Sequence, residues 1–382
     1  MAFDFLEPVS TEFIDFINTL PPQALGKKVV FHTENEFPVL QNATVAIFGV
    51  LDNRGFQINK SVNLTSIRKS FYSLYPGNWQ SVIIDLGDIP QGNEQEDTYY
   101  AVSEICAQLI KQDVVPIVLG GSQDITYAMY RSFDQLDQMV NIVSVDSTFD
   151  LGNDEVKQTA GSYLSKIIVN QPNNLFNFSN VGYQTYYNSQ EEIDLIEKLF
   201  FDAYRLGDVS SNISIAEPVF RDADIVTFDL NAVKSADSGN IVTFVPNGFN
   251  GKEICSLSRY AGISDQVKCF GLFNHNGTVH ESSLIAQIIW YFIEGFNFRT
   301  KENPSVNQNN YLRYIVPVDD FELIFLKSIK TERWWIEIPF ITNVNNKLKR
   351  NTLLPCSYDD YLRACDQEIP ERWWKAQRKL VL

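Results

Sequence analysis

Histidine and cysteine, the side chains that most often hold transition metals, are scarce in this sequence. There are three histidines, His32, His275 and His280, and five cysteines, none of them in a CxxC pair. Paired cysteines at that spacing bind zinc or form redox disulfides, so neither kind of site is indicated. The odd number of scattered cysteines also disfavours a disulfide framework and fits a reducing cytoplasm.

Long apolar runs and an excess of positive charge are also missing. No window approaches about 18 uninterrupted apolar residues, and the N-terminus has neither a basic n-region nor an apolar h-region. We therefore expect no membrane insertion and no signal peptide. The 31 basic residues are outnumbered by 47 acidic ones, which gives a formal charge of −16. That charge disfavours nucleic acid as a partner.

Segments with the character of strands and of helices alternate between residues 44 and 298. The predicted strands are 44–50, 81–86, 114–119, 142–145, 178–184, 225–230 and 267–273, and helical periodicity fills the intervals, including 191–206 and 282–296. Such alternation predicts a three-layer α-β-α fold with a mostly parallel central sheet. We therefore divide the chain into an N-terminal extension (1–40), an α/β domain (41–298) and a C-terminal, tryptophan-rich extension packed on that domain (299–382).

Acidic and polar side chains follow three of these predicted strands. Asp146 and Asp150 close the strand 142–145, with no Lys or Arg in the loop until Lys157. Asp229 ends a second strand, and the polar run 122–124 follows a third. Sites in open α/β sheets lie at the carboxyl ends of strands, so we expect these side chains to meet. Carboxylate oxygens are the ligands that a hard cation prefers.

The order of these three strand ends, at residues 120–124, 146–150 and 229–231, resembles the ureohydrolase family, which includes arginase, agmatinase and formimidoylglutamase. That family has a Gly-Gly-Asp-His, an Asp-Ala-His-x-Asp and a Ser-x-Asp-x-Asp element, which supply the ligands of a two-manganese site. Weaker matches lie at 67–68, 85–89 and 182–184. The resemblance implies an arginase-like fold for residues 41–298 and hydrolysis of a guanidino or formimino compound, such as formimidoylglutamate.

The chain keeps only half of the six metal ligands that the resemblance implies. Gln123 and Thr148 stand where the family's elements place histidines, and Asn231 stands where one places an aspartate. Neutral amides and hydroxyls are weak ligands for manganese, and two such ions need well-defined coordination to activate water. The three ligand positions that remain acidic are Asp146, Asp150 and Asp229.

These departures predict a protein without a cofactor, whose former metal site has decayed and which serves as a binding, scaffold or regulatory protein. The alternative is an active hydrolase of a guanidino or formimino compound with two manganese ions. A single Mg²⁺ or Ca²⁺ held by oxygen ligands, including Gln123 or Asn231, is a further possibility. A small-molecule sensor that keeps the old pocket is another, although the sequence does not indicate its ligand.

Other residues near the three strand ends have predicted roles as well. Packed aspartates raise one another's pKa, so we expect a neighbouring cation to neutralise them, and Lys234 is the candidate. Leu272 stands where the family has a substrate-binding glutamate. The remaining candidates for the pocket are Ser122, Asp124 and His275.

The C-terminal extension holds two tryptophan pairs. Trp334 and Trp335 lie in a strand-like segment, so their rings should face opposite sides. Trp373 and Trp374 are expected to fix the tail of the chain to the main domain. The alternative for both pairs, Trp334 and Trp335 as well as Trp373 and Trp374, is an interface with a protein partner or a second subunit. The resemblance also suggests a homo-oligomer.

Overall fold

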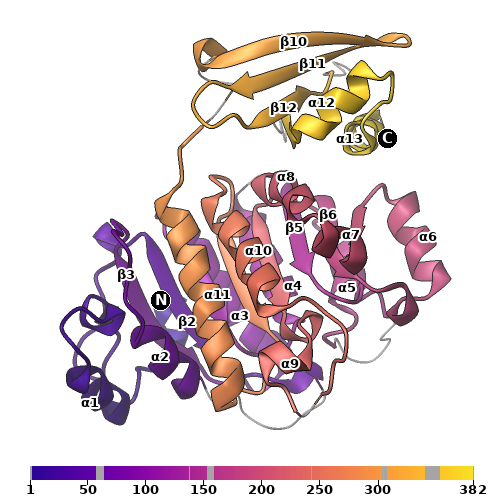
Figure 1. Cartoon of the computed structure of the whole chain (residues 1–382). Helices are drawn as coiled ribbons and strands as arrows, with labels where there is room; N and C mark the ends of the chain where they lie inside the picture. The colour runs from indigo at the N-terminus through magenta and orange to yellow at the C-terminus, as the bar shows by residue number, and fades with distance from the viewer. Residues whose placement is uncertain are drawn as a thin grey trace.

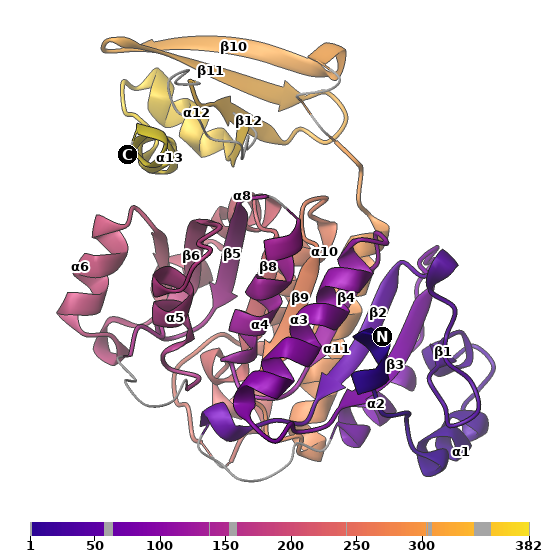
Figure 2. The ribbon, with the colours of Figure 1, turned by 180° about the vertical axis from the view of Figure 1, so that it is seen from behind.

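A parallel sheet with helices on both faces forms the body of the computed structural model (Figures 1 and 2). The structure describes residues 2–56, 64–136, 138–152, 159–241, 243–302, 304, 308–339 and 353–381. The strand order in this described part is β1-β3-β2-β4-β9-β8-β5-β6-β7, and every neighbouring pair is parallel. The strands are β1 (Val30–Phe31), β2 (Val45–Val50), β3 (Ile83–Ile89), β4 (Val115–Leu119), β5 (Val140–Val145), β6 (Leu175–Tyr183), β7 (Asp202–Arg205), β8 (Ile225–Asp229) and β9 (Cys269–Phe273).

The central strands are apolar throughout because both faces of the sheet are covered. In β2, Val45 and Ile47 pack into one hydrophobic core, whereas Ala46 and Phe48 pack into the other. Side chains alternate between the faces of a strand, so burial on both faces requires a continuous apolar run. The predicted three-layer α/β fold is confirmed.

Each face of the sheet has its own set of helices. The first core lies under helices that include α2, α10 and α11, and the second lies under α3, α4 and α5. Figure 2 shows the second set in front of the sheet. No helix in the described ranges combines the length and the apolar character needed to cross a bilayer. The helix bounds are α2 (Thr65–Tyr72), α3 (Gln95–Ile110), α4 (Ile125–Arg131), α5 (Tyr163–Val169), α10 (Gly251–Ile263) and α11 (Val279–Asn297).

One predicted helix, 191–206, is wrong in its second half. Helix α6 (Gln190–Lys198) ends early, and the segment 202–205 is strand β7 at the edge of the sheet. Phe200 has φ +55°, a left-handed conformation that a helix cannot continue through. The predicted single helix is therefore a shorter helix followed by the edge strand of the sheet.

The N-terminal residues pack against the same sheet. Helix α1 (Thr11–Thr19) places Phe13 and Ile17 in the first core, and β1 pairs with β3. Beside them, Arg68 of α2 makes a two-pronged ion pair with Asp85 of β3, at 2.8 and 3.1 Å. Both side chains are buried, so this pair joins a helix to the sheet inside the core.

The C-terminal residues form a small antiparallel sheet with two helices packed on it. Its strands run in the order β10-β11-β12-β13. Residues of the sheet and of the two helices form a separate hydrophobic core that includes Trp334 and Trp373. Trp335 belongs to a different cluster, so the rings of Trp334 and Trp335 face opposite sides as predicted. The elements are β10 (Tyr311–Val318), β11 (Phe321–Ser328), β12 (Trp334–Glu337), β13 (Leu353–Cys356), α12 (Tyr358–Cys365) and α13 (Glu371–Val381).

This C-terminal module lies beyond the amino ends of β5 to β8 (Figures 1 and 2). Arg221, at the end of α8 (Glu217–Arg221), donates to the backbone oxygens of Trp334 and Cys356, each at 3.0 Å. Lys375 of α13 donates to the Phe201 carbonyl at 3.1 Å, and Trp374 contacts the Phe200 ring.

Charge also favours this contact between the module and the main domain. Residues 299–382 carry 14 of the 31 basic residues but only 11 of the 47 acidic ones, so the module is net positive and the rest strongly negative. Opposite net charges favour docking. The module therefore covers the amino edge of the sheet and leaves the carboxyl edge uncovered by its own residues.

Candidate functional site

Four neighbouring strands, β4, β9, β8 and β5, bring the predicted site residues to the carboxyl edge of the sheet. Gln123 follows β4, Asp146 follows β5, and Asp229 is the last residue of β8. Asn274 follows β9 and joins two of these loops. Its Oδ1 accepts from the Gln123 backbone N–H (3.0 Å), and its Nδ2 donates to Asp229 Oδ2 (2.7 Å).

Thr148 lies between the two aspartates of the β5 loop. Its backbone N–H donates to Asp146 Oδ1 at 3.0 Å, and its hydroxyl lies 3.2 Å from Asp146 Oδ1 and 2.8 Å from Asp150 Oδ1. A threonine hydroxyl carries one proton and can donate to only one carboxylate at a time. The aspartates are therefore linked to each other through Thr148.

The electrostatics of the three aspartates favour protons on them. Burial raises the pKa of Asp146 well above its usual value, and the neighbouring Asp150 raises it further. Burial and Asp229 raise the pKa of Asp150 to about 7. The pKa of Asp229 is also well above its usual value, first through burial and then through Asp146.

The expected cation, Lys234, is placed away from this arrangement. Its Nζ lies 3.7 Å from Asp237 Oδ2, within the short helix α9 (Ser235–Ser238) and its N-cap. Within the described ranges, no ion pair joins Lys234 to any of the three aspartates. Leu272 is buried in the first core as part of β9, and it presents no polar group to the edge.

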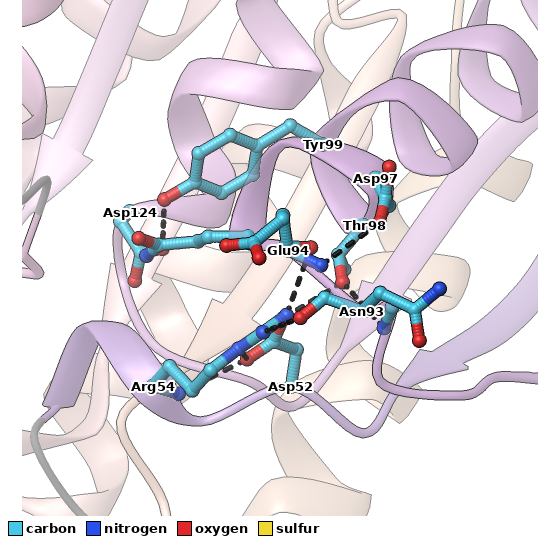
Figure 3. A network of polar contacts seen from close by, with 10 residues as sticks. Asp52, Arg54, Asn93, Glu94, Asp97, Thr98, Tyr99 and Asp124 are labelled. Atoms are coloured by element: carbon cyan, nitrogen blue, oxygen red, sulfur yellow. Dashed lines mark hydrogen bonds and ion pairs between the residues drawn. The ribbon is translucent and has the colours of Figure 1, made fainter.

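Asp124 points into a different polar network, which Figure 3 shows. Its Oδ2 accepts from the Tyr99 hydroxyl at 2.5 Å and from Gln95 Nε2 at 2.9 Å. In the same network Arg54 pairs with Asp52. These contacts hold the β4–α4 loop and the loop after β2 to helix α3. The role of Asp124 in the described structure is therefore to fix the loop that carries Ser122 and Gln123.

Two residues of the site were not predicted from the sequence. Asn274 has φ +56°, which asparagine tolerates better than most residues, and this turn aims its amide between Gln123 and Asp229. Tyr163 of α5 is buried, and its pKa is raised well above the usual value by burial and then by Asp150 and Asp146. The position of Asn274 directly after a strand could have indicated it, whereas a tyrosine inside a helix gives no such sign.

His275 is fully enclosed beside the β4 loop. It is 2% exposed, and neither ring nitrogen has a hydrogen-bond partner. Burial lowers its pKa to about 4, so the ring is neutral at physiological pH. A neutral imidazole at this place can accept or donate a hydrogen bond to a ligand.

Replacing His275 with leucine should remove an acid-sensitive contribution to stability. The unfolded chain binds a proton near pH 6.5 and the folded ring only near pH 4, so this contribution is present above about 6.5 and is lost as pH falls toward 4. The loss in the natural protein should approach about 3 kcal/mol relative to His275→Leu. Urea unfolding at pH 7 and pH 4.5 measures the difference. His280→Leu, which changes an exposed ring, is the control and should retain the loss.

Comparison with known proteins identifies the family. The model of the Arginase family matches residues 58–290, which is more than half of the chain and includes all three strand ends. The chain belongs to the arginase family. The predicted ureohydrolase resemblance is therefore confirmed, and the low identities below agree with a divergent member.

The relatives found by sequence include formimidoylglutamases of staphylococci. The Staphylococcus epidermidis protein is 24% identical over 260 residues, which cover 64% of this chain and 83% of that protein. The Staphylococcus aureus protein is 21% identical over 269 residues, covering 65% and 86%. The C-terminal module lies outside the family match.

Solved structures with the same fold include both formimidoylglutamases and an agmatine ureohydrolase. The Bacillus subtilis formimidoylglutamase has a TM-score of 0.62 at 16% identity and covers 70% of this chain and 90% of its own. The Trypanosoma cruzi formiminoglutamase with Mn²⁺ has a TM-score of 0.59 at 17% identity, covering 69% and 100%. The agmatine ureohydrolase of Thermoplasma volcanium has a TM-score of 0.58 at 17% identity, covering 74% and 97%.

The donor set of this arginase-family chain does not fit two manganese ions. At the site, the oxygen-containing side chains of Gln123 and Thr148 stand where imidazoles are implied, and the Thr148 hydroxyl is bound to the aspartates. Within the part of the chain that the structure describes, no group of three or more His, Cys, Asp and Glu side chains is arranged to hold a metal ion.

Proposed function

We propose that this arginase-family chain is a binding or regulatory protein of the cytoplasm and that it has lost the hydrolase activity that depends on two manganese ions. The observation that carries the proposal is Thr148, whose hydroxyl links Asp146 and Asp150 at the position of a lost imidazole. Aspartates that share protons and a hydroxyl are poor ligands until those protons leave.

The C-terminal module supports a role as a scaffold or a partner-binding protein. It is held to the α/β domain by Arg221 and Lys375, so the two parts present one continuous surface. On it, Trp374 of α13 remains 38% exposed beside Phe200. Exposed aromatic rings of this kind concentrate binding energy in protein interfaces. A protein partner or a second copy of the chain would find its contact here.

The second candidate function is hydrolysis of formimidoylglutamate or a related formimino or guanidino compound. The names of the sequence relatives favour it, since formimidoylglutamases align over 83% of their length. This alternative needs a metal-activated water at a site without imidazole ligands.

Metal analysis and a substrate panel separate the two functions. The purified full chain, incubated with Mn²⁺ and desalted, should retain fewer than two manganese ions. It should release neither formamide from formimidoylglutamate nor urea from arginine and agmatine. Two retained ions together with product release would establish the hydrolase and reject the binding role as the main function.

A further inference from the structure

A pocket of about 520 Å³ lies where the C-terminal module meets the main domain. Helix α8 and Tyr260 of α10 line it from the main domain, and the β11–β12 turn, Trp334 and the first turn of α12 line it from the module. Helix α8 ends just before β8 begins, so the pocket lies at the amino ends of the strands, opposite the carboxyl edge (Figures 1 and 2). Pockets of this volume hold small molecules and are common where two parts of a protein meet.

The two most buried charges of this pocket are both positive. The side chain of Arg221 is 6% exposed and that of Arg333 is 13% exposed. They share one carboxylate, because Glu217 Oε1 lies 3.2 Å from Arg221 Nε and 3.3 Å from Arg333 Nε. Burial lowers the pKa of Arg221; Glu217 raises it in part, and the charge of Arg333 lowers it again. The inner end of the pocket therefore has one positive charge more than its carboxylate balances.

Both guanidinium groups keep N–H donors for a ligand. A guanidinium group has five such donors. Arg221 uses one for the Trp334 carbonyl and one for the Cys356 carbonyl, which fixes the group in place. Within the described residues, Glu217 is the only side chain that pairs with Arg333. A carboxylate that enters the pocket would meet two guanidinium groups, which are well suited to binding it.

The outer end of the pocket has the opposite charge. Lys327 Nζ is paired with Glu332 Oε1 at 3.2 Å, and the Glu332 side chain is 79% exposed. Asp359 of α12 is exposed as well and lines the same pocket. One cation and two carboxylates therefore surround the mouth. A ligand that suits both ends has a negative group at its inner end and a positive group at its outer end.

Aromatic rings supply the apolar part of the lining. The ring centroids of Trp334 and Tyr358 lie 5.5 Å apart, and Tyr358 is 53% exposed. Tyr260 adds a third ring from the main domain. Aromatic faces and edges pack well against another ring. The pocket thus combines two separated charges with a surface for an aromatic group.

We propose that this pocket binds a free amino acid with an aromatic side chain. The α-carboxylate pairs with Arg333 and Arg221, the α-ammonium lies at the acidic mouth, and the ring packs against Trp334 and Tyr358. A simple anion would use the inner end alone. The site makes no use of the carboxyl edge, so this inference does not depend on the proposed function.

Calorimetric titration of the full chain with L-phenylalanine and with L-tryptophan tests the proposal. We expect one equivalent of at least one of them to bind, with a dissociation constant below roughly 1 mM. The matching amines, phenethylamine and tryptamine, lack the carboxylate, and hydrocinnamate and indolepropionate lack the ammonium. Each analogue should bind at least about tenfold more weakly than its amino acid, since each loses one charged contact.

Two variants and one matched control locate the ligand. Arg333→Gln should weaken binding of the amino acid at least about tenfold and leave the affinity for the amine unchanged, because the amine has no carboxylate to lose. A variant that merely failed to fold would lose both. Tyr358→Ala removes a half-exposed ring and should weaken binding of the amino acid and the amine alike. Lys330→Gln removes an exposed charge from the same turn outside the pocket, and it should change none of these affinities.

Three results would overturn the proposal. The first is the absence of binding heat and of a rise in the thermal unfolding midpoint with either amino acid at roughly 10 mM. The second is binding of hydrocinnamate, indolepropionate or inorganic phosphate as tightly as the amino acid, which would indicate a simple anion site. The third is unchanged affinity in both Arg333→Gln and Tyr358→Ala, which would place the ligand elsewhere. Product release in the substrate panel would reject the binding role proposed above and leave this test unaffected.

Discussion

A triple variant, Gln123→His, Thr148→His and Asn231→Asp, should bind two manganese ions per chain. The substitutions return two imidazoles and one carboxylate to the positions that the ureohydrolase elements imply, beside Asp146 and Asp229. Imidazole is a far better manganese ligand than an amide or a hydroxyl, and removal of Thr148 frees the two aspartates that its hydroxyl links. Affinity for Mn²⁺ should rise on the order of 100-fold or more, as measured by metal analysis after dialysis against graded free Mn²⁺.

The control for the triple variant carries Asp146→Asn in addition. It retains the new imidazoles but loses the Asp146 carboxylate as a metal ligand. The quadruple variant should therefore bind at most one manganese ion. If the natural sequence already retains two manganese ions, the decay of the site is refuted. If the triple variant folds and retains none, other residues of the site oppose the metal.

Arg68→Met should destabilise the protein by about 3–5 kcal/mol. Arg68 donates to both oxygens of Asp85 and to the Gly87 carbonyl, and Asp85 is fully buried. Methionine fills much of the space but leaves the Asp85 carboxylate without its counter-ion, and an uncompensated buried charge is costly. Chemical denaturation of the full chain gives the free energy of unfolding.

The neighbouring residue provides a matched control for this ion pair. Lys69→Met removes a charge that pairs with the exposed carboxylate of Glu12 at 3.2 Å. Exposed pairs contribute about 0–1 kcal/mol, so the two variants should differ by several-fold in their effect. Equal losses would show that the buried pair adds no more than the loss of side-chain packing.

The central sheet was predictable because its strands are apolar on both faces. Apolar runs such as 44–50 and 225–230 are typical of strands that are buried on both faces. Their alternation with helices indicates a parallel sheet. The segment 202–205 was predicted as helix, since its few apolar residues suit either period. Its true state as β7 depends on the left-handed turn at Phe200 and on the pairing with β6. The domain boundaries at residues 40 and 298 stay predictions.

At the site, residue identities were predictable and their contacts were not. The strand ends indicated Gln123, Thr148 and Asp150 as positions of interest, and the structure brings those elements to one edge. That Lys234 pairs with Asp237 depends on the short helix α9, which local sequence does not reveal. The bridging amide of Asn274 depends on a strand more than a hundred residues from Gln123.

Strand β9 pairs with β4 on one side and with β8 on the other, although it is the last strand of the main sheet in the chain. Until residues 269–273 have been synthesised, no strand connects β4 to β8, and the sheet consists of two separate halves. Gln123 belongs to one half and the three aspartates to the other. The carboxyl edge is therefore assembled late in synthesis, after a long-range contact that folds slowly, and a nascent chain stalled before β9 exposes both of its half-sheets.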